Sequence, residues 1–173
     1  MSLNVPDGPA QASLLLRTCT RAEFAMDKMV RIARLIAQPV LRLALAVPFW
    51  YSGLTKWVGF LALSPAATYL FSEEFKLHLP GGPYHLPFPN LLAPIDAVME
   101  IALPILLVLG LGTRFAALGL LVMTSVIELV VPEGWANFHL PWAGLALAIM
   151  ALGAGPLSLD HLIARMMGRK SQP

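Results

Sequence analysis

The chain has 173 residues, of which 57% are hydrophobic and only 13% are charged, and its formal net charge is +2. This composition excludes an ordinary soluble domain, in which about a quarter of the residues are charged. It also excludes a nucleic-acid-binding protein, because no basic patch with interleaved aromatic residues occurs. The single cysteine, Cys19, cannot form an intramolecular disulfide or a CxxC redox pair.

Four apolar stretches dominate the sequence, and each can cross a bilayer as a helix when its interfacial flanks are included. A transmembrane helix needs about 20 predominantly apolar residues. The predicted spans cover residues 40–63, 91–111, 115–131 and 140–152. We therefore predict an all-α fold, an integral membrane four-helix bundle.

The domain organisation follows from these spans. Residues 36–157 are predicted to form the transmembrane domain, residues 1–35 a basic N-terminal segment, and residues 158–173 an amphipathic tail. Within the N-terminal segment, residues 10–34 mix basic and apolar side chains, which is typical of an interfacial helix on anionic lipid. A soluble, frayed N-terminus is the alternative. In the tail, Ser158 is a suitable N-cap for a second interfacial helix.

The first loop, residues 64–90, is the one long connection between spans. A third interfacial helix is predicted over residues 65–76, with Tyr69, Phe71 and Phe75 facing the membrane. Residues 80–90 are rich in proline and glycine, so we expect irregular backbone there.

The distribution of basic residues predicts the orientation in the membrane. Lysine and arginine near the spans favour the cytoplasmic side. They are frequent before the first span and after the fourth, whereas the loop at residues 132–138 has none. We therefore expect both termini and the turn at residues 110–114 to be cytoplasmic.

This topology places five ionisable side chains in the outer half of the bundle, namely Lys56, Asp96, Glu100, Glu128 and His139. Asp96 and Glu100 are four residues apart and share a helix face. Intramembrane charges avoid lipid, so we expect these side chains to converge inside the bundle. Several carboxylates beside one lysine cannot all be ionised, so at least one is expected to hold a proton. Such a site suits proton-coupled chemistry, quinone hydrogen bonding or cation binding.

Each of these residues also has a simpler interpretation. Arg42 lies on one stripe of the first helix with Phe49 and Lys56, which adds Arg42 to the candidate polar site. Arg42 and Lys56 can also extend to opposite interfaces. Asp96 and Glu128 lie near span ends, where water reaches them. Glu100 is the deepest, and we predict that it pairs with Lys56. Whether that pair is structural or functional stays open.

Aromatic and histidine side chains give weaker signals. Five aromatic residues at the outer level predict an aromatic belt, with the wall of a quinone pocket as the alternative. These are Trp57, Tyr69, Tyr84, Trp135 and Trp142. His78, His85 and His139 lack HxxH or HExxH spacing, so we expect no metal site and keep these histidines only as a weak alternative.

In their order and spacing, the short motifs of the chain resemble the DoxX family of small four-helix membrane proteins. The resemblance covers about residues 36–163. The matching positions are Arg42, the run at residues 52–56 with Gly53 and Lys56, Glu100, the turn at 109–117 with Arg114, and residues 155–160 with Ser158 and Asp160.

The resemblance implies a multi-pass protein of the bacterial inner membrane. Family members are similar to the small subunit of an archaeal thiosulfate:quinone oxidoreductase, and one is associated with a redox complex that handles thiol stress. This implies quinone as a ligand and a partner protein that carries the redox centre. Other similar proteins are encoded beside enzymes that mature metal-binding peptides, and residues 73–76 look like that subgroup.

The sequence is therefore consistent with three functions. The first is a membrane subunit of a quinone-linked redox system, in which Lys56, Glu100 and Asp96 hold the quinone. The second is an accessory or transport protein for copper or a metallopeptide. The third is a non-catalytic anchor for a partner complex. The sequence contains no autonomous catalytic motif, and it leaves self-association open.

Overall fold

The structure is a computed structural model, which describes the backbone of residues 9–168 and the side chains of residues 22–168. The chain divides into two units, residues 1–37 and residues 38–173. The boundary falls inside the first helix, α1 (Pro9–Thr55). The backbone of the basic segment at 10–34 is helical, as predicted. Leu14, Leu15, Cys19, Arg169 and Lys170 lie outside the described side chains.

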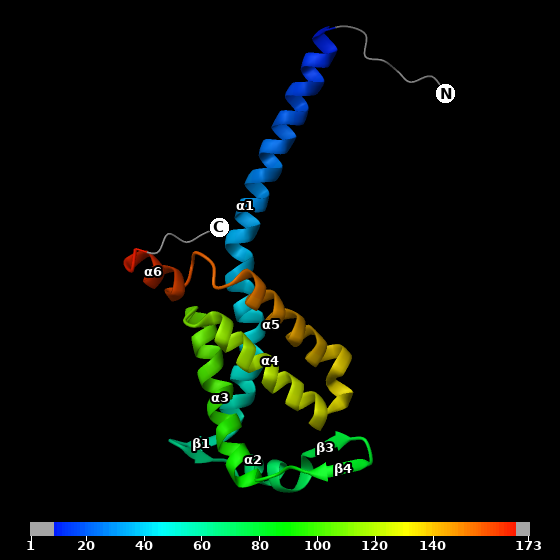
Figure 1. Ribbon diagram of the computed structural model, residues 1–173, viewed down its shortest axis with the longest axis vertical. Coiled ribbons are helices and arrows are strands. Elements are labelled where there is room, and N and C mark those ends of the chain that lie inside the picture. The colour runs from blue at the N-terminus through cyan, green and yellow to red at the C-terminus, as the bar shows by residue number, and fades with distance from the viewer. Residues whose placement is uncertain (1–8, 169–173) are drawn as a thin grey trace, which may run out of the picture. The chain divides into compact units, whose positions relative to one another are not determined.

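Residues 38–173 contain the bundle, made by the last part of α1 together with α3 (Pro89–Leu109), α4 (Thr113–Val130) and α5 (Leu140–Leu152) (Figure 1). Among the described residues, four helical segments are long and apolar enough to cross a membrane: Ala22–Thr55, Pro89–Leu109, Thr113–Val130 and Pro132–Leu152. The predicted fold class and the number of spans are thus confirmed. Two small hairpins, which the prediction did not contain, are added to the helices.

The predicted end of the first span was wrong. Helix α1 ends at Thr55, and the apolar residues that follow form a hairpin of β1 (Trp57–Gly59) and β2 (Ala62–Leu63). Phe60, at the tip of this hairpin, is almost fully exposed. Hydropathy alone cannot separate apolar residues of a helix from apolar residues of a hairpin that faces lipid.

The fourth span is longer than predicted. The segment expected to be an outer loop is helical, with a 3₁₀ turn η2 (Pro132–Gly134) and a π turn η3 (Trp135–His139) leading into α5. The backbone N–H of Leu140 donates to Trp135 O, which joins the π turn to α5. Polar and glycine residues in this segment concealed the helix from the hydropathy pattern.

The first loop contains the predicted helix, but it is split into α2 (Pro65–Tyr69) and a π turn η1 (Leu70–Glu74). Ser64 caps α2, and its Oγ accepts a hydrogen bond from Ala67 N. The region expected to be irregular instead forms a second hairpin of β3 (Lys76–Leu79) and β4 (Gly82–His85). Pro80 and Gly81 occupy the turn, and Gly81 has φ +105°, which suits the glycine position of a type II turn.

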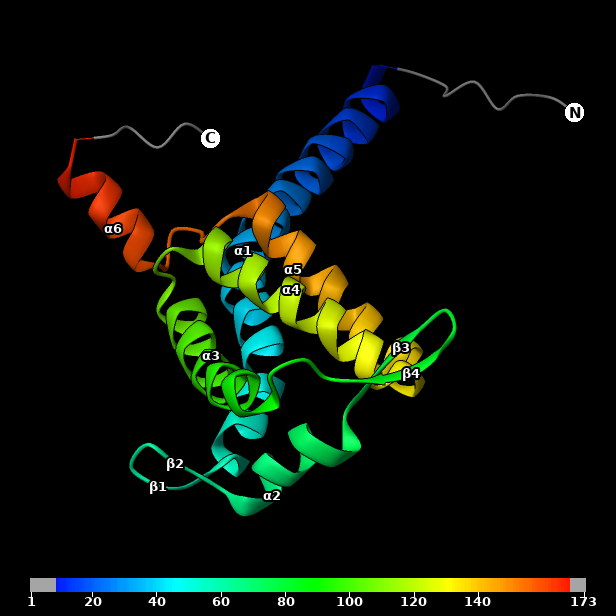
Figure 2. The same cartoon turned by 60° about the horizontal axis from the view of Figure 1, so that its bottom comes forward.

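The bundle core lies between all four helices. Leu45 and Phe49 of α1, Leu107 of α3, Leu120 of α4 and Ile149 of α5 form one buried cluster. Short residues allow close helix contact, as at Gly119 of α4, where a Cβ would lie 2.8 Å from Leu103 Cδ1. We refer to the two ends of the bundle as the Arg42 end and the Lys56 end. The hairpins and α2 lie at the Lys56 end (Figures 1 and 2).

The tail begins as predicted. Ser158 Oγ accepts a hydrogen bond from His161 N and caps α6 (Leu159–Met166). Leu159, Leu162 and Met166 are exposed on this helix, and so is Met167 just after it, so its apolar stripe is available to lipid.

Candidate functional site

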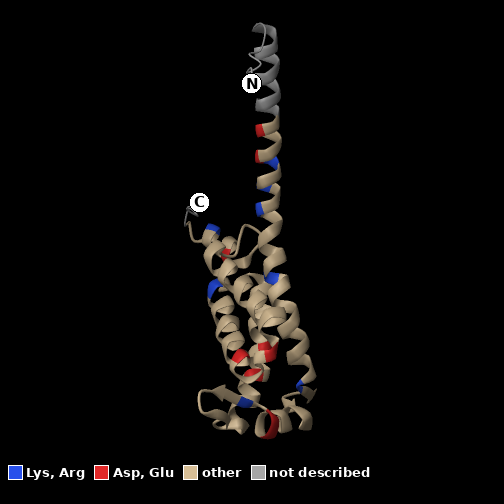
Figure 3. Ribbon diagram, turned by 90° about the vertical axis from the view of Figure 1, so that its right-hand side faces the viewer, with Lys and Arg blue, Asp and Glu red and all other residues tan. Residues whose placement is uncertain are grey.

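The end of α1 places Lys56 against two carboxylates of α3. The Lys56 ammonium contacts Asp96, and it lies 2.7 Å from Glu100 Oε2. Asp96 and Glu100 are one helical turn apart, so one ammonium group reaches both. Glu100 is only 3% exposed, whereas Lys56 and Asp96 are partly buried. In Figure 3, the acidic residues of the bundle gather toward the Lys56 end.

Gly53 allows α1 to approach α3 closely enough for this cluster. A Cβ at residue 53 would lie 2.8 Å from Ile101 Cδ1 and 3.0 Å from Glu100 Cβ. Contacts this short require a neighbour to move, so a larger residue would separate the helices. The sequence identified Gly53 only as a motif position, and the structure gives it this packing role.

A cavity of about 680 Å³ opens beside the cluster. Its volume falls within the usual range of small-molecule sites, about 300–1,000 Å³. The walls are mostly apolar and come from α1, α3, α4, α5 and the first loop, while the polar side chains are few. They are Ser52, Thr55, Lys56, Ser64, Asp96 and Glu100. An apolar chamber with a few converging polar groups is the usual form of a site for an amphipathic small molecule.

Glu100 is held by Lys56 at the wall of this cavity. Its Oε2 lies 2.7 Å from Lys56 Nζ, and this oxygen has no other hydrogen-bond partner within the described part of the chain. A carboxylate oxygen has two lone pairs, so Oε2 can accept a further hydrogen bond from a ligand. The site therefore has a carboxylate oxygen that can accept a hydrogen bond and an ammonium group that can donate one.

Aromatic side chains enclose the cavity. Phe71 is buried, lines the cavity, and places its ring centroid 5.5 Å from Lys56 Nζ. Phe75 packs beside it at a centroid distance of 5.2 Å. The expectation that Phe71 and Phe75 face the membrane was therefore wrong, because η1 turns them inward over the bundle. Tyr69 is exposed as predicted.

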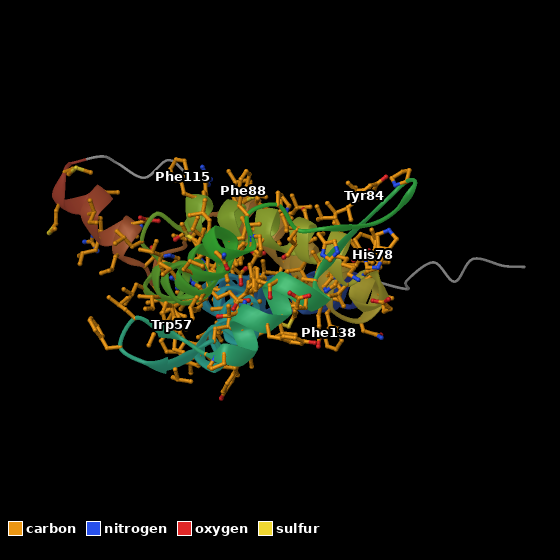
Figure 4. All side chains as sticks on the ribbon, turned by 90° about the horizontal axis from the view of Figure 1, so that it is seen from below. Trp57, His78, Tyr84, Phe88, Phe115 and Phe138 are labelled. Carbon is orange, nitrogen blue, oxygen red and sulfur yellow. The ribbon has the colours of Figure 1, made fainter. Side chains whose placement is uncertain are left out.

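The five outer aromatic residues do not behave as one group. Trp142 lines the cavity, and its ring packs on Phe49 at a centroid distance of 5.1 Å. Tyr84 and Trp135 are exposed, as a membrane belt requires. Figure 4, viewed from the Lys56 end, shows Trp57 and Tyr84 on opposite sides of this end. Only Trp142 fits the pocket-wall interpretation.

The predicted convergence of five ionisable groups was wrong in part. Glu128 and His139 form their own pair, with His139 Nδ1 2.6 Å from Glu128 Oε2. Neither residue lines the cavity. His139 is buried because Gly134 leaves room for its ring, where a Cβ would lie 2.5 Å from His139 Cε1. His139 is the last residue of η3, one of the helical turns that the sequence analysis missed.

Arg42 lies at the other end and binds backbone. It is 3% exposed and donates hydrogen bonds to Leu157 O at 2.6 Å and to Val108 O at 3.5 Å. Asp160 accepts from Gly112 N at 2.8 Å and from Thr113 N at 2.9 Å. These contacts join α6 to the turn between α3 and α4. The motif positions Arg42, Ser158 and Asp160 thus form a structural joint away from the cavity, and Arg114 lies near the same turn, next to Gly153.

The histidines of the weak metal alternative are not gathered. His78 Nδ1 lies 3.3 Å from Leu129 O, His85 is exposed on β4, and His139 pairs with Glu128. Among the residues that the structure describes, no group of three or more His, Cys, Asp or Glu is placed to hold a metal ion.

Comparison with known proteins agrees with this architecture. The family model described as DoxX matches residues 37–133. An uncharacterized protein of Haemophilus influenzae is 32% identical over 158 residues, which cover 83% of this chain and 94% of that protein. No solved structure matches.

Proposed function

The chain belongs to the DoxX family and is a multi-pass membrane protein, and we propose that it is a membrane subunit of a quinone-linked redox system. The quinone headgroup would occupy the cavity beside Lys56, Asp96 and Glu100. The observation that carries the proposal is the buried pair of Glu100 and Lys56 at the wall of a mostly apolar cavity. A quinone matches this arrangement because its ring is apolar and its two oxygens are polar.

The roles of the residues follow from their chemistry. The Lys56 ammonium group donates a hydrogen bond to a quinone carbonyl oxygen, and Asp96 orients that ammonium group. Glu100 Oε2 accepts a hydrogen bond from the hydroxyl group of the reduced form. Bound quinone supplies two-electron, two-proton chemistry. The carboxylates can exchange protons with it, and Trp142 and Phe71 provide apolar walls for the ring.

The proposal includes a partner and an orientation. A chain with one cysteine cannot carry a thiol pair of its own, so a partner protein is proposed as the electron donor. The excess of basic residues before the first span and after the fourth supports cytoplasmic termini in a bacterial inner membrane. The cavity would then lie in the outer half of that membrane.

Quinone binding tests the proposal directly. The purified protein in detergent is titrated with a ubiquinone or menaquinone analogue, and quenching of tryptophan fluorescence is followed. We expect saturable quenching that Trp142→Phe reduces, because Trp142 lines the cavity. Removal of a hydrogen bond to a charged group costs about 1.5–3 kcal/mol, so Glu100→Gln is expected to weaken binding by about tenfold or more.

The matched control is Glu74→Gln, which makes the same change at an exposed carboxylate of η1 that does not line the cavity. It is expected to leave the affinity within about twofold of the unmodified protein. Non-saturable quenching, or an equal loss of quinone affinity in Glu100→Gln and Glu74→Gln, would contradict the quinone site. Blank binding together with intact assembly of a partner complex would favour the anchor function instead.

A further inference from the structure

We propose that the space between the outer halves of α3 and α4 is a lateral portal, through which the hydrocarbon tail of the ligand passes from the cavity into the bilayer. The inference rests on the proposed function and narrows it. The ligand would be a membrane-soluble quinone with a prenyl tail, and it would enter from lipid instead of from water.

The two helices touch near the Arg42 end and separate toward the Lys56 end. At the contact, Gly119 of α4 packs on Leu103 of α3, where an added Cβ would lie 2.8 Å away. Met99 of α3 is one turn further out, and Val122 and Val126 of α4 follow Gly119 on the same side. These residues line the cavity instead of closing the space between the helices. Figures 1 and 2 both show α3 and α4 diverging from their shared turn.

Close packing joins the other neighbouring helices around the cavity. Gly53 brings α1 against α3 at Glu100 and Ile101. The rings of Phe49 and Trp142 join α1 to α5 at a centroid distance of 5.1 Å. Between α4 and α5, residues such as Leu120 and Ala146 share one buried cluster.

The Lys56 end is also covered. Phe71 of η1 and Leu86, which follows β4, are both buried and pack with Ala93 of α3. The first loop thus forms a lid over the chamber. The helix contacts on the other sides and the cover at this end favour the α3–α4 side, where four apolar lining residues are exposed, as the route for a quinone tail.

The exposure of the lining residues agrees with an opening on that side. Ile95 and Met99 of α3 and Val122 and Val126 of α4 all line the cavity, yet each is 42–56% exposed. All four are apolar, so the opening is lined by surface that suits a hydrocarbon chain. The charged groups Lys56, Asp96 and Glu100 lie where α3 faces the end of α1. A ligand in this site would place its polar head inside and its tail through the gap.

Two quinones with one headgroup test the portal. Ubiquinone analogues with a decyl tail and with no tail are titrated into the purified protein, and tryptophan quenching is followed. Val126→Phe adds bulk at the opening without adding a tryptophan. Because the tail would lose apolar contact and space, we expect about a tenfold loss of affinity for the tailed analogue. Affinity for the tailless analogue should stay within about twofold, because the headgroup contacts are unchanged.

The matched control is Val98→Phe, the same change at an exposed position of α3 that does not line the cavity. It should alter neither affinity. Two results would overturn the portal while leaving the headgroup site in place. One is equal affinities in Val126→Phe and Val98→Phe, and the other is an equal loss of affinity for both analogues in Val126→Phe. If the unmodified protein binds neither analogue, the proposed function itself fails.

If Val126→Phe does not fold, a second measurement on the unmodified protein tests the portal. The unmodified protein is illuminated with a quinone that carries a photoreactive group on its tail, and the labelled peptides are identified. Labels on α3 and α4 support the portal. Saturable labelling confined to α1 and α5 would overturn it.

Discussion

The two ends of the bundle use buried charge in opposite ways. At the Arg42 end, charged side chains bind backbone groups: Arg42 donates to Leu157 O and Val108 O, and Asp160 accepts from two N–H groups of the α3–α4 turn. At the Lys56 end, charged side chains bind each other beside a cavity. The first arrangement fixes helices in place, and the second leaves polar atoms available to a ligand.

The difference shows that the group bound by a buried charged side chain decides whether that side chain can also bind a ligand. A backbone carbonyl oxygen neither changes partner by moving nor gains a proton. Arg42 therefore keeps its hydrogen bonds once α6 has packed against the bundle. A carboxylate can exchange its ammonium partner for a ligand donor, and Glu100 Oε2 has no partner other than Lys56 within the described residues. We therefore expect substitutions at the Arg42 end to change stability without affinity, and those at the Lys56 end to change both.

The largest effect is expected at Gly110, in the joint at the Arg42 end. Gly110 has φ +68°, and a Cβ there would lie 2.5 Å from Ser158 Cβ and would overlap the Arg42 guanidinium group. The left-handed backbone costs a non-glycine residue about 1–2 kcal/mol, and overpacking adds about 1–3 kcal/mol. Gly110→Ala should therefore lower the free energy of unfolding by about 3 kcal/mol, measured by unfolding in mixed micelles.

Gly112 provides the matched control in the same turn. It also has left-handed backbone, with φ +56°, but a Cβ there would meet nothing within 4 Å. Gly112→Ala should therefore show only the backbone cost, about 1–2 kcal/mol. Equal losses in the two variants would mean that the joint between Arg42, Ser158 and Gly110 adds no packing constraint.

The next largest loss of stability is expected when Lys56, at the other end of the bundle, is replaced. Lys56→Met leaves two carboxylates without their cation, and removal of one partner of a buried pair costs about 3–5 kcal/mol. Because this pair is partly exposed, we expect a loss of about 2–3 kcal/mol in the same unfolding assay. The double variant Lys56→Met with Glu100→Leu removes the unpaired buried charge and should recover most of this stability.

Quinone affinity separates structure from function in these variants. Both the single and the double variant should lose binding, although only the single variant is destabilised. A double variant that folds and still binds quinone would show that the cluster is a packing device, like the joint at the Arg42 end.

The sequence predicted the helices better than their boundaries. Long apolar stretches were sufficient to place four spans, because a helix that crosses the lipid bilayer must be mostly apolar. They could not show that α1 ends at Thr55, since the residues after Lys56 are equally apolar in a hairpin. The helical turns before α5 were missed for the opposite reason, because Glu133 and Gly134 lower the hydropathy of residues that are helical.

The candidate site was predictable in its residues but not in its shape. Spacing placed Asp96 and Glu100 on one face, and topology placed Lys56 at the same level. The cavity depends on features that no local pattern carries: the close approach at Gly53, the inward turn of Phe71, and the divergence of α4 from α3 beyond Gly119. Tertiary packing sets all three, so only the structure reveals them.

A smaller effect is expected at Asp160, the acidic member of the joint. Its carboxylate accepts from Gly112 N and Thr113 N at the start of α4, in the manner of a helix cap supplied by another helix. Loss of such a cap costs about 1–2 kcal/mol. Asp160→Ala should lower the free energy of unfolding by this amount and leave quinone affinity unchanged. A loss of affinity would contradict the separation of the two ends.

The smallest effect is expected at Glu128, and it tests whether the polar cluster extends beyond the cavity. Glu128 lies 2.6 Å from His139, but its side chain is 27% exposed and neither residue lines the cavity. Partly exposed pairs contribute about 0–1 kcal/mol, so Glu128→Gln should cost less than about 1 kcal/mol. Quinone affinity should remain within about twofold, measured beside Glu100→Gln in the same titration. If Glu128→Gln weakens binding as much as Glu100→Gln does, the Glu128–His139 pair acts with the Lys56 cluster, and Trp142, which packs on His139 and lines the cavity, provides a contact between the two.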